Sequence, residues 1–140
     1  MILNGEMINN LHKKISPYKV EEALKELGND KSPRLDGIPV ELWKLLHQQY
    51  KLADEKDKHK FSNITEILAH IFNNIAKHSI TKETRFNDGW LCPIYKKEVD
   101  NIANCRPITV LNTDYKLFTK VIVTRLSNVT PHLIVRATLP

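Results

Sequence analysis

The 140-residue sequence has little cysteine, and it has no apolar run long enough to cross a membrane. Cys92 and Cys105 are its only cysteines, whereas a structural zinc site needs four closely spaced Cys or His ligands. A disulfide between Cys92 and Cys105 remains one interpretation, but two free thiols in a reducing compartment are the favoured one. The first residues also lack the apolar core of a signal peptide. These absences predict an intracellular protein, nuclear or cytoplasmic, without a membrane partner.

The charge balance favours an anionic partner. The chain has 21 Lys and Arg against 16 Asp and Glu, for a formal net charge of +5. Such an excess attracts polyanions such as nucleic acids, although many basic proteins bind none. The length fits one domain, or a subdomain of something larger.

Apolar residues recur at helical spacing in four segments and predict four substantial helices, at 20–27, 40–46, 64–75 and 117–129. Start signals precede several of them. Ser16 followed by Pro17 is typical of an N-cap, Asn63 with Glu66 resembles a capping box, and Thr113 or Asp114 would cap the last helix.

The ends of the chain carry weaker patterns. Residues 1–15 have no clear period and predict a poorly structured N-terminal tail. Residues 135–140 predict a divergent C-terminal tail, which leaves 16–134 as the folded part.

Two short β-type runs, 90–95 and 108–111, flank a polar connection and predict a two-stranded antiparallel ribbon. Pro93 and Pro107 remove backbone donors, so neither run is expected to be a long central strand. With the helices, the ribbon predicts a mostly helical α+β fold. Three cations lie at the edges of the connection, where they could bind phosphate: Lys96, Lys97 and Arg106.

The motif W-x-x-P-I-Y-K-K, followed by N-x-R-P-I-T-V-L-N-T-D-Y-K, resembles the fingers region of reverse transcriptases from non-long-terminal-repeat retrotransposons. These enzymes are RNA-directed DNA polymerases of the right-hand type. The resemblance runs from about residue 16 to about residue 134. It implies that 16–134 are a partial fingers-like domain, truncated before the palm.

The loop N-D-K-S-P-R-L-D-G-I-P at 29–39 is similar to the family signature K-S-P-G-x-D-G-I-P, which lies close to bound template. Arg34 stands where the family has glycine, and it either strains the loop or adds a phosphate contact. Without the resemblance, a solvated turn would be the favoured interpretation. The resemblance implies template contacts by Lys31, Ser32, Arg34, Asp36 and Gly37.

For the ribbon, the resemblance implies that Arg106 and a lysine of the Lys96–Lys97 pair neutralise the triphosphate of the incoming nucleotide. Arg106 is the stronger candidate, because R-P-I is the most fixed part of the match. Cys105 departs from the aromatic residue usual before that arginine. Without the resemblance, the two lysines indicate only a charged turn end.

The palm aspartates that hold two Mg²⁺ ions in this family are absent from the sequence. The chain is therefore expected to bind no cofactor and to lack polymerase activity by itself. The implied partners are an RNA template, a DNA primer, a deoxynucleoside triphosphate and the missing palm domain. Two alternatives remain open: a non-catalytic basic nucleic-acid-binding module, and a small helical interaction protein.

Overall fold

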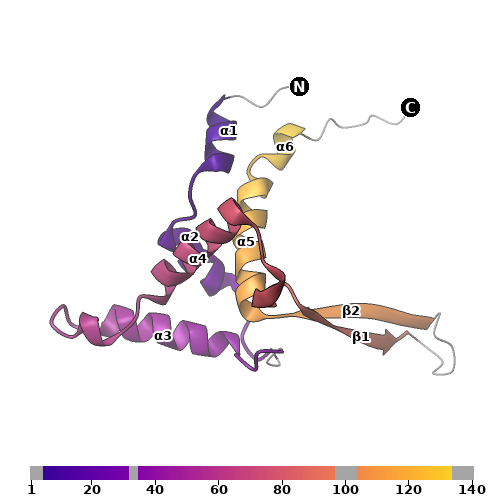
Figure 1. Ribbon diagram of the computed structural model, residues 1–140, viewed down its shortest axis with the longest axis horizontal. Coiled ribbons are helices and arrows are strands. Elements are labelled where there is room, and N and C mark those ends of the chain that lie inside the picture. Colours follow the sequence, from indigo (N-terminus) through magenta and orange to yellow (C-terminus); the bar gives the residue numbers. More distant parts are fainter. Residues whose placement is uncertain (1–4, 32–34, 97–103, 134–140) are drawn as a thin grey trace.

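The computed structural model describes residues 5–31, 35–96 and 104–133. The described residues form an α+β fold of five helices of eight or more residues, a single-turn helix and a two-stranded antiparallel ribbon (Figure 1). The elements are α1 (Gly5–His12), α2 (Pro17–Glu26), α3 (Val40–Leu52), η1 (Lys58–Lys60), α4 (Ile64–His78), η2 (Lys82–Thr84), β1 (Gly89–Tyr95), β2 (Cys105–Leu111), α5 (Thr113–Ser127) and α6 (Thr130–Leu133). The predicted mostly helical fold with one ribbon is confirmed.

Helices α2, α4 and α5 enclose the core. Some of the periodic apolar residues of each helix meet there, while Ile67, Ile71 and Leu126 stay exposed. The largest fully buried side chains are Val20, Leu24, Phe72 and Leu117. The Phe72 and Phe118 rings lie 5.2 Å apart between centroids. This burial is the main favourable term for folding, so these three helices form the stable body of the molecule.

Two predicted caps are present, and a third is shifted by one residue. The Ser16 side chain accepts a hydrogen bond from the Lys19 amide, and the Asn63 side chain accepts one from the Glu66 amide. Helix α5 begins at Thr113 with Asn112 in the N-cap position. The Thr113 hydroxyl instead donates to the Ile38 carbonyl at 3.1 Å, so a contact distant in sequence takes the place of a local cap.

The structure differs from the predicted tail over 1–15, because residues 5–12 form helix α1. None of its residues is buried, which explains why the sequence carries no clear core stripe there. Arg125 on α5 donates from Nη1 to the carbonyl of Leu11 at 3.0 Å. This hydrogen bond joins the end of the helix to α5.

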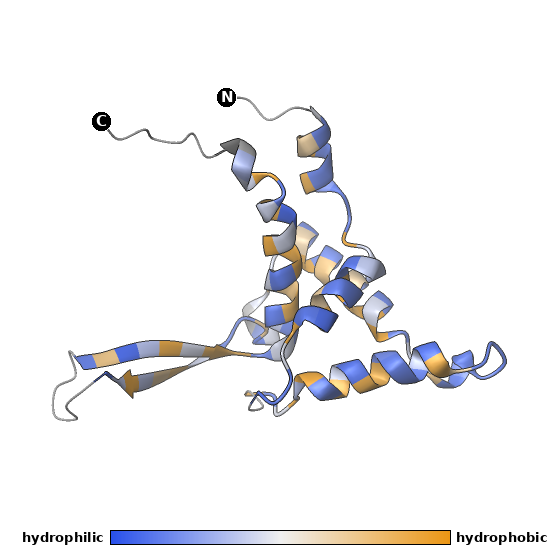
Figure 2. Ribbon diagram, turned by 180° about the vertical axis from the view of Figure 1, so that it is seen from behind, coloured by the Kyte–Doolittle hydropathy of each residue, from blue (hydrophilic) through white to orange (hydrophobic). Residues whose placement is uncertain are grey.

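Helix α3 crosses below the other helices and turns part of its apolar face outward (Figures 1 and 2). Only Val40 of this helix is buried, while Leu42 and Leu45 are 41% and 49% exposed. Polar contacts hold the helix: Lys44 donates from Nζ to the Leu27 carbonyl at 2.6 Å. None of the described helices is both long and apolar enough to cross a membrane.

Candidate nucleic-acid interface

The ribbon of β1 and β2 extends away from the helical body (Figure 1). Its register runs from Gly89 opposite Leu111 at the inner end to Tyr95 opposite Cys105 at the outer end. Gly89 leaves no room for a side chain, because an added Cβ would lie 2.6 Å from the Thr109 methyl group. The two strands therefore lie in close contact at the inner end, and the cations Lys96 and Arg106 lie toward the outer end.

Arg106 lies on one face of the ribbon together with apolar side chains. It stands opposite Ile94, and side chains on a strand alternate between faces with a period of two. Trp90 and Ile108 therefore share the face of Arg106, and both are exposed. This face therefore carries a cation toward the outer end and an exposed aromatic ring near the inner end, four positions apart along β1.

Lys96 and Arg106 are exposed, and no described carboxylate lies within ion-pair distance of either. The loop that contains η1 is different, because Lys58 pairs with Glu55, and Lys60 pairs with Asp57 at 2.7 Å. The ribbon cations keep their charge available, whereas the loop lysines are neutralised by neighbours. Lys97, the third predicted phosphate contact, lies outside the described residues.

The loop implied to contact template is described only in part. Lys31 is exposed, and the Asp36 carboxylate accepts a hydrogen bond from the Ile38 amide at 3.0 Å. Gly37 has a φ of 70°, in the left-handed region that glycine adopts at least cost. Ser32 and Arg34 lie outside the described residues, so the structure does not bear on the expected effect of Arg34.

The loop and the ribbon cations lie at different places. Leu35 lines a shallow hollow with Gly89 and Trp90, at the inner end of the ribbon. Ile94, the partner of Arg106, is five residues farther along β1. At about 3.3 Å per residue, Leu35 and Arg106 are separated by roughly 17 Å along the ribbon. The described part of the loop at Leu35 therefore lies near the inner end of the ribbon, whereas Arg106 lies toward its outer end.

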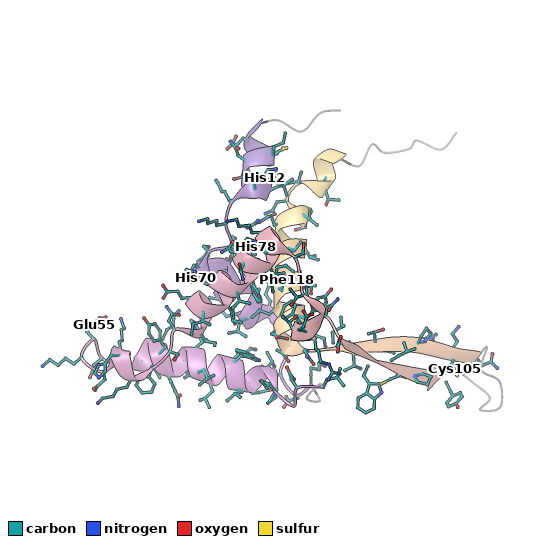
Figure 3. All side chains as sticks on the ribbon, viewed as in Figure 1. His12, Glu55, His70, His78, Cys105 and Phe118 are labelled. Atoms are coloured by element: carbon teal, nitrogen blue, oxygen red, sulfur yellow. The ribbon has the colours of Figure 1, made fainter. Side chains whose placement is uncertain are left out.

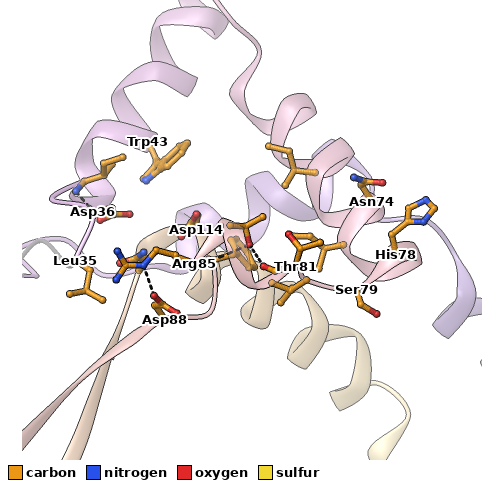
Figure 4. A pocket seen from close by; sticks show the side chains of 17 residues that line it. Leu35, Asp36, Trp43, Asn74, His78, Ser79, Thr81, Arg85, Asp88 and Asp114 are labelled. Atoms are coloured by element: carbon orange, nitrogen blue, oxygen red, sulfur yellow. Dashed lines mark hydrogen bonds and ion pairs between the residues drawn. The ribbon is translucent and has the colours of Figure 1, made fainter.

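A cleft of about 920 Å³ lies between α3, α4 and the inner end of the ribbon (Figure 4). Trp43, Ile71 and Phe86 form part of its apolar wall, and three carboxylates also line it: Asp36, Asp88 and Asp114. Arg85 donates from Nε to Asp88 at 2.8 Å. With three carboxylates against one described guanidinium, this cleft is a poor place for a phosphate.

The pKa of the Asp114 carboxyl is raised above its ordinary value, mainly by burial and further by the charge of Asp36, while the Tyr115 amide opposes the shift. The Asn112 side-chain oxygen and the Trp43 indole nitrogen are buried without a partner among the described residues. The sequence pattern predicted only a capping role for Asp114. The Thr113–Ile38 hydrogen bond, which links segments 75 residues apart, joins the start of α5 to the loop that contains Asp36.

The two cysteines are free and point to opposite faces of the ribbon. Cys92 stands opposite Ile108, and Cys105 lies three positions from Ile108, so its side chain has the other orientation. Figure 3 shows Cys105 at the outer end of the ribbon. The disulfide that the sequence left open is incompatible with this register.

Within the described part of the chain, no group of three or more His, Cys, Asp and Glu side chains could hold a metal ion. A search against models of known protein families found no match for this chain. The geometry of the ribbon and the sequence motifs are therefore the basis for the functional interpretation.

Proposed function

We propose that this chain is part of the fingers region of a reverse transcriptase from a non-long-terminal-repeat retrotransposon. The support is the ordered motif from Trp90 to Lys116, together with a mostly helical body and a single β-ribbon that carries the R-P-I sequence. In a complete polymerase, this part would contact the RNA template, the DNA primer and the triphosphate of the incoming nucleotide.

The observation that carries the proposal is the state of Arg106. Its side chain is exposed on a projecting ribbon, with no described carboxylate within ion-pair distance. A guanidinium in this state can bind phosphate oxygens through two parallel hydrogen bonds. Lys96, just beyond the outer end of β1, would add a second positive charge.

The contribution of such cations to catalysis is electrostatic. They stabilise negative charge that shifts between phosphate oxygens, and they move no proton. The Mg²⁺ ions of a complete polymerase would be held by palm carboxylates, which this sequence does not contain. We therefore expect the isolated chain to bind nucleic acid without extending a primer.

The test compares Arg106→Ala with Lys60→Ala, which remove the same formal charge. Binding of single-stranded RNA is measured by fluorescence anisotropy at several salt concentrations. A lost phosphate contact should flatten the slope of log K against log salt by about 0.7 and weaken all sequences alike. Arg106→Ala should show this effect, whereas Lys60→Ala should leave the slope unchanged, because Asp57 already neutralises Lys60. Equal effects would mean that binding follows net charge alone.

The outward leucines of α3 favour a second candidate, a small helical interaction protein whose basic charge is incidental. The same measurement separates the two functions. Failure of the wild-type chain to bind RNA at low salt would support the interaction protein. A change in the salt slope that is specific to Arg106→Ala would support the fingers region. RNA binding that Arg106→Ala and Lys60→Ala weaken equally would leave the alternative of a non-catalytic basic module.

A further inference from the structure

The hydrogen-bond pattern of the ribbon can be assigned from one contact at its outer end. The Lys96 amide donates to the Asn104 carbonyl at 2.8 Å, and these residues lie one step beyond the Tyr95–Cys105 pair. Opposed residues in an antiparallel ribbon alternate between hydrogen-bonded and non-hydrogen-bonded pairs. Ile94–Arg106 is therefore a hydrogen-bonded pair, and Pro93–Pro107 is a non-hydrogen-bonded pair.

This assignment places both prolines at the outer edges. In a non-hydrogen-bonded pair, the backbone N–H and C=O groups point away from the partner strand. The outward positions are 89, 91, 93 and 95 on β1, and 105, 107, 109 and 111 on β2. Pro93 and Pro107 each occupy one of the two inner positions of their edge and have no N–H. Each edge therefore lacks one of its four outward donors, while the ladder inside the ribbon is intact.

The ribbon would otherwise be open to strand addition. Each strand has seven residues, and Trp90 and Leu91 are 63% and 60% exposed. An exposed apolar strand with a free edge is a template for pairing with another chain, and edge proline is one device that prevents it.

We propose that Pro93 and Pro107 close both edges of the ribbon to strand addition. The ribbon stays two-stranded, and a partner contacts its faces and not its edges. The inference is independent of what those faces bind, so it stands or falls separately from the proposed function.

The test restores both donors with the double substitution Pro93→Thr and Pro107→Thr. Threonine favours strands, and the new N–H groups point outward, so the ladder is unchanged. Sedimentation equilibrium compares the self-association of the variant and the wild-type chain. One restored hydrogen bond of ordinary strength should tighten self-association by about tenfold. The matched control is Cys92→Thr with Ile108→Thr, a hydrogen-bonded pair that gains no outward donor, and it should associate no more tightly than wild type.

Equal self-association of wild type and the proline double variant would overturn the proposal, as would an equal increase in the control. A second pair of variants tests the edge assignment itself. Leu91→Pro removes an outward donor and should keep the cross-strand nuclear Overhauser effects of the ribbon. Cys92→Pro removes an inward donor and should abolish them. If both variants keep or both lose these signals, the assignment of the edges is wrong and the proposal fails.

Discussion

The helical body buries many of its apolar side chains, whereas the ribbon leaves most of its large apolar side chains exposed. Phe72 on α4 and Leu117 on α5 are fully buried, whereas Trp90 and Leu91 on β1 are mostly exposed. The body gains its stability from its own packing, because three helices share one core. A two-stranded ribbon has no such second layer, and isolated hairpins are marginal in water. The difference indicates that packing within the body stabilises the fold, whereas the apolar side chains of the ribbon contribute little to that packing.

The largest effect should follow from a cavity in the body. Phe72→Ala removes a fully buried ring that packs against Phe118, and the loss of packing should lower the free energy of unfolding by about 3–5 kcal/mol. Urea denaturation followed by circular dichroism would measure it. A loss below about 1 kcal/mol would contradict the assignment of the core to α2, α4 and α5.

An intermediate effect should follow from protonation of Glu21, which joins α2 to α3. Hydrogen bonds from Lys25 and Lys51 lower the pKa of the Glu21 carboxyl from 4.5 to about 2. A carboxyl group whose pKa is lowered on folding stabilises the folded state at pH values above its unfolded-state pKa. This contribution should therefore be lost as the pH falls from about 4.5 to about 2.

The two lysines are exposed and solvent screens them, so we expect the contribution to be about 1–2 kcal/mol. Urea denaturation of wild type and Glu21→Gln between pH 2 and pH 7 would measure it. The variant should be less stable at pH 7, and the difference should disappear near pH 2. A difference that is constant over this range would show that the ion pairs do not hold α3.

The smallest effect on stability should come from the ribbon. Trp90→Ala removes a large side chain that is mostly exposed, so the free energy of unfolding should change by no more than about 0.5 kcal/mol. The same denaturation experiment measures it, with Phe72→Ala as the contrast. If the two variants lose equal stability, the ribbon belongs to the core, and the comparison between the two regions fails.

Local pattern was sufficient to predict the helices of the body. The stripe from Ile64 to Ile75 places its buried members on one side because α-helical geometry fixes which residues share a face. The same reasoning identified the ribbon, since two short β-type runs that contain or follow a proline fit edge strands, although β2 begins at Cys105 and not at Ile108. Ser16 and Asn63 were also identifiable, because each cap needs only residues up to three positions away.

The sequence by itself determined the element types and the cations at the outer end of the ribbon, because these depend on near neighbours. Only the tertiary structure decided which side of α3 faces the body. The apolar residues of α3 cover so broad a face of the helix that the pattern did not show which of them would be buried. It also joined α1 to α5 through the Arg125–Leu11 hydrogen bond and brought Asp36 near Asp114, which are relations between distant segments. Finally, it set the register that turns Pro93 and Pro107 outward and places Arg106 toward the outer end of the ribbon, because strand pairing is a relation between two segments.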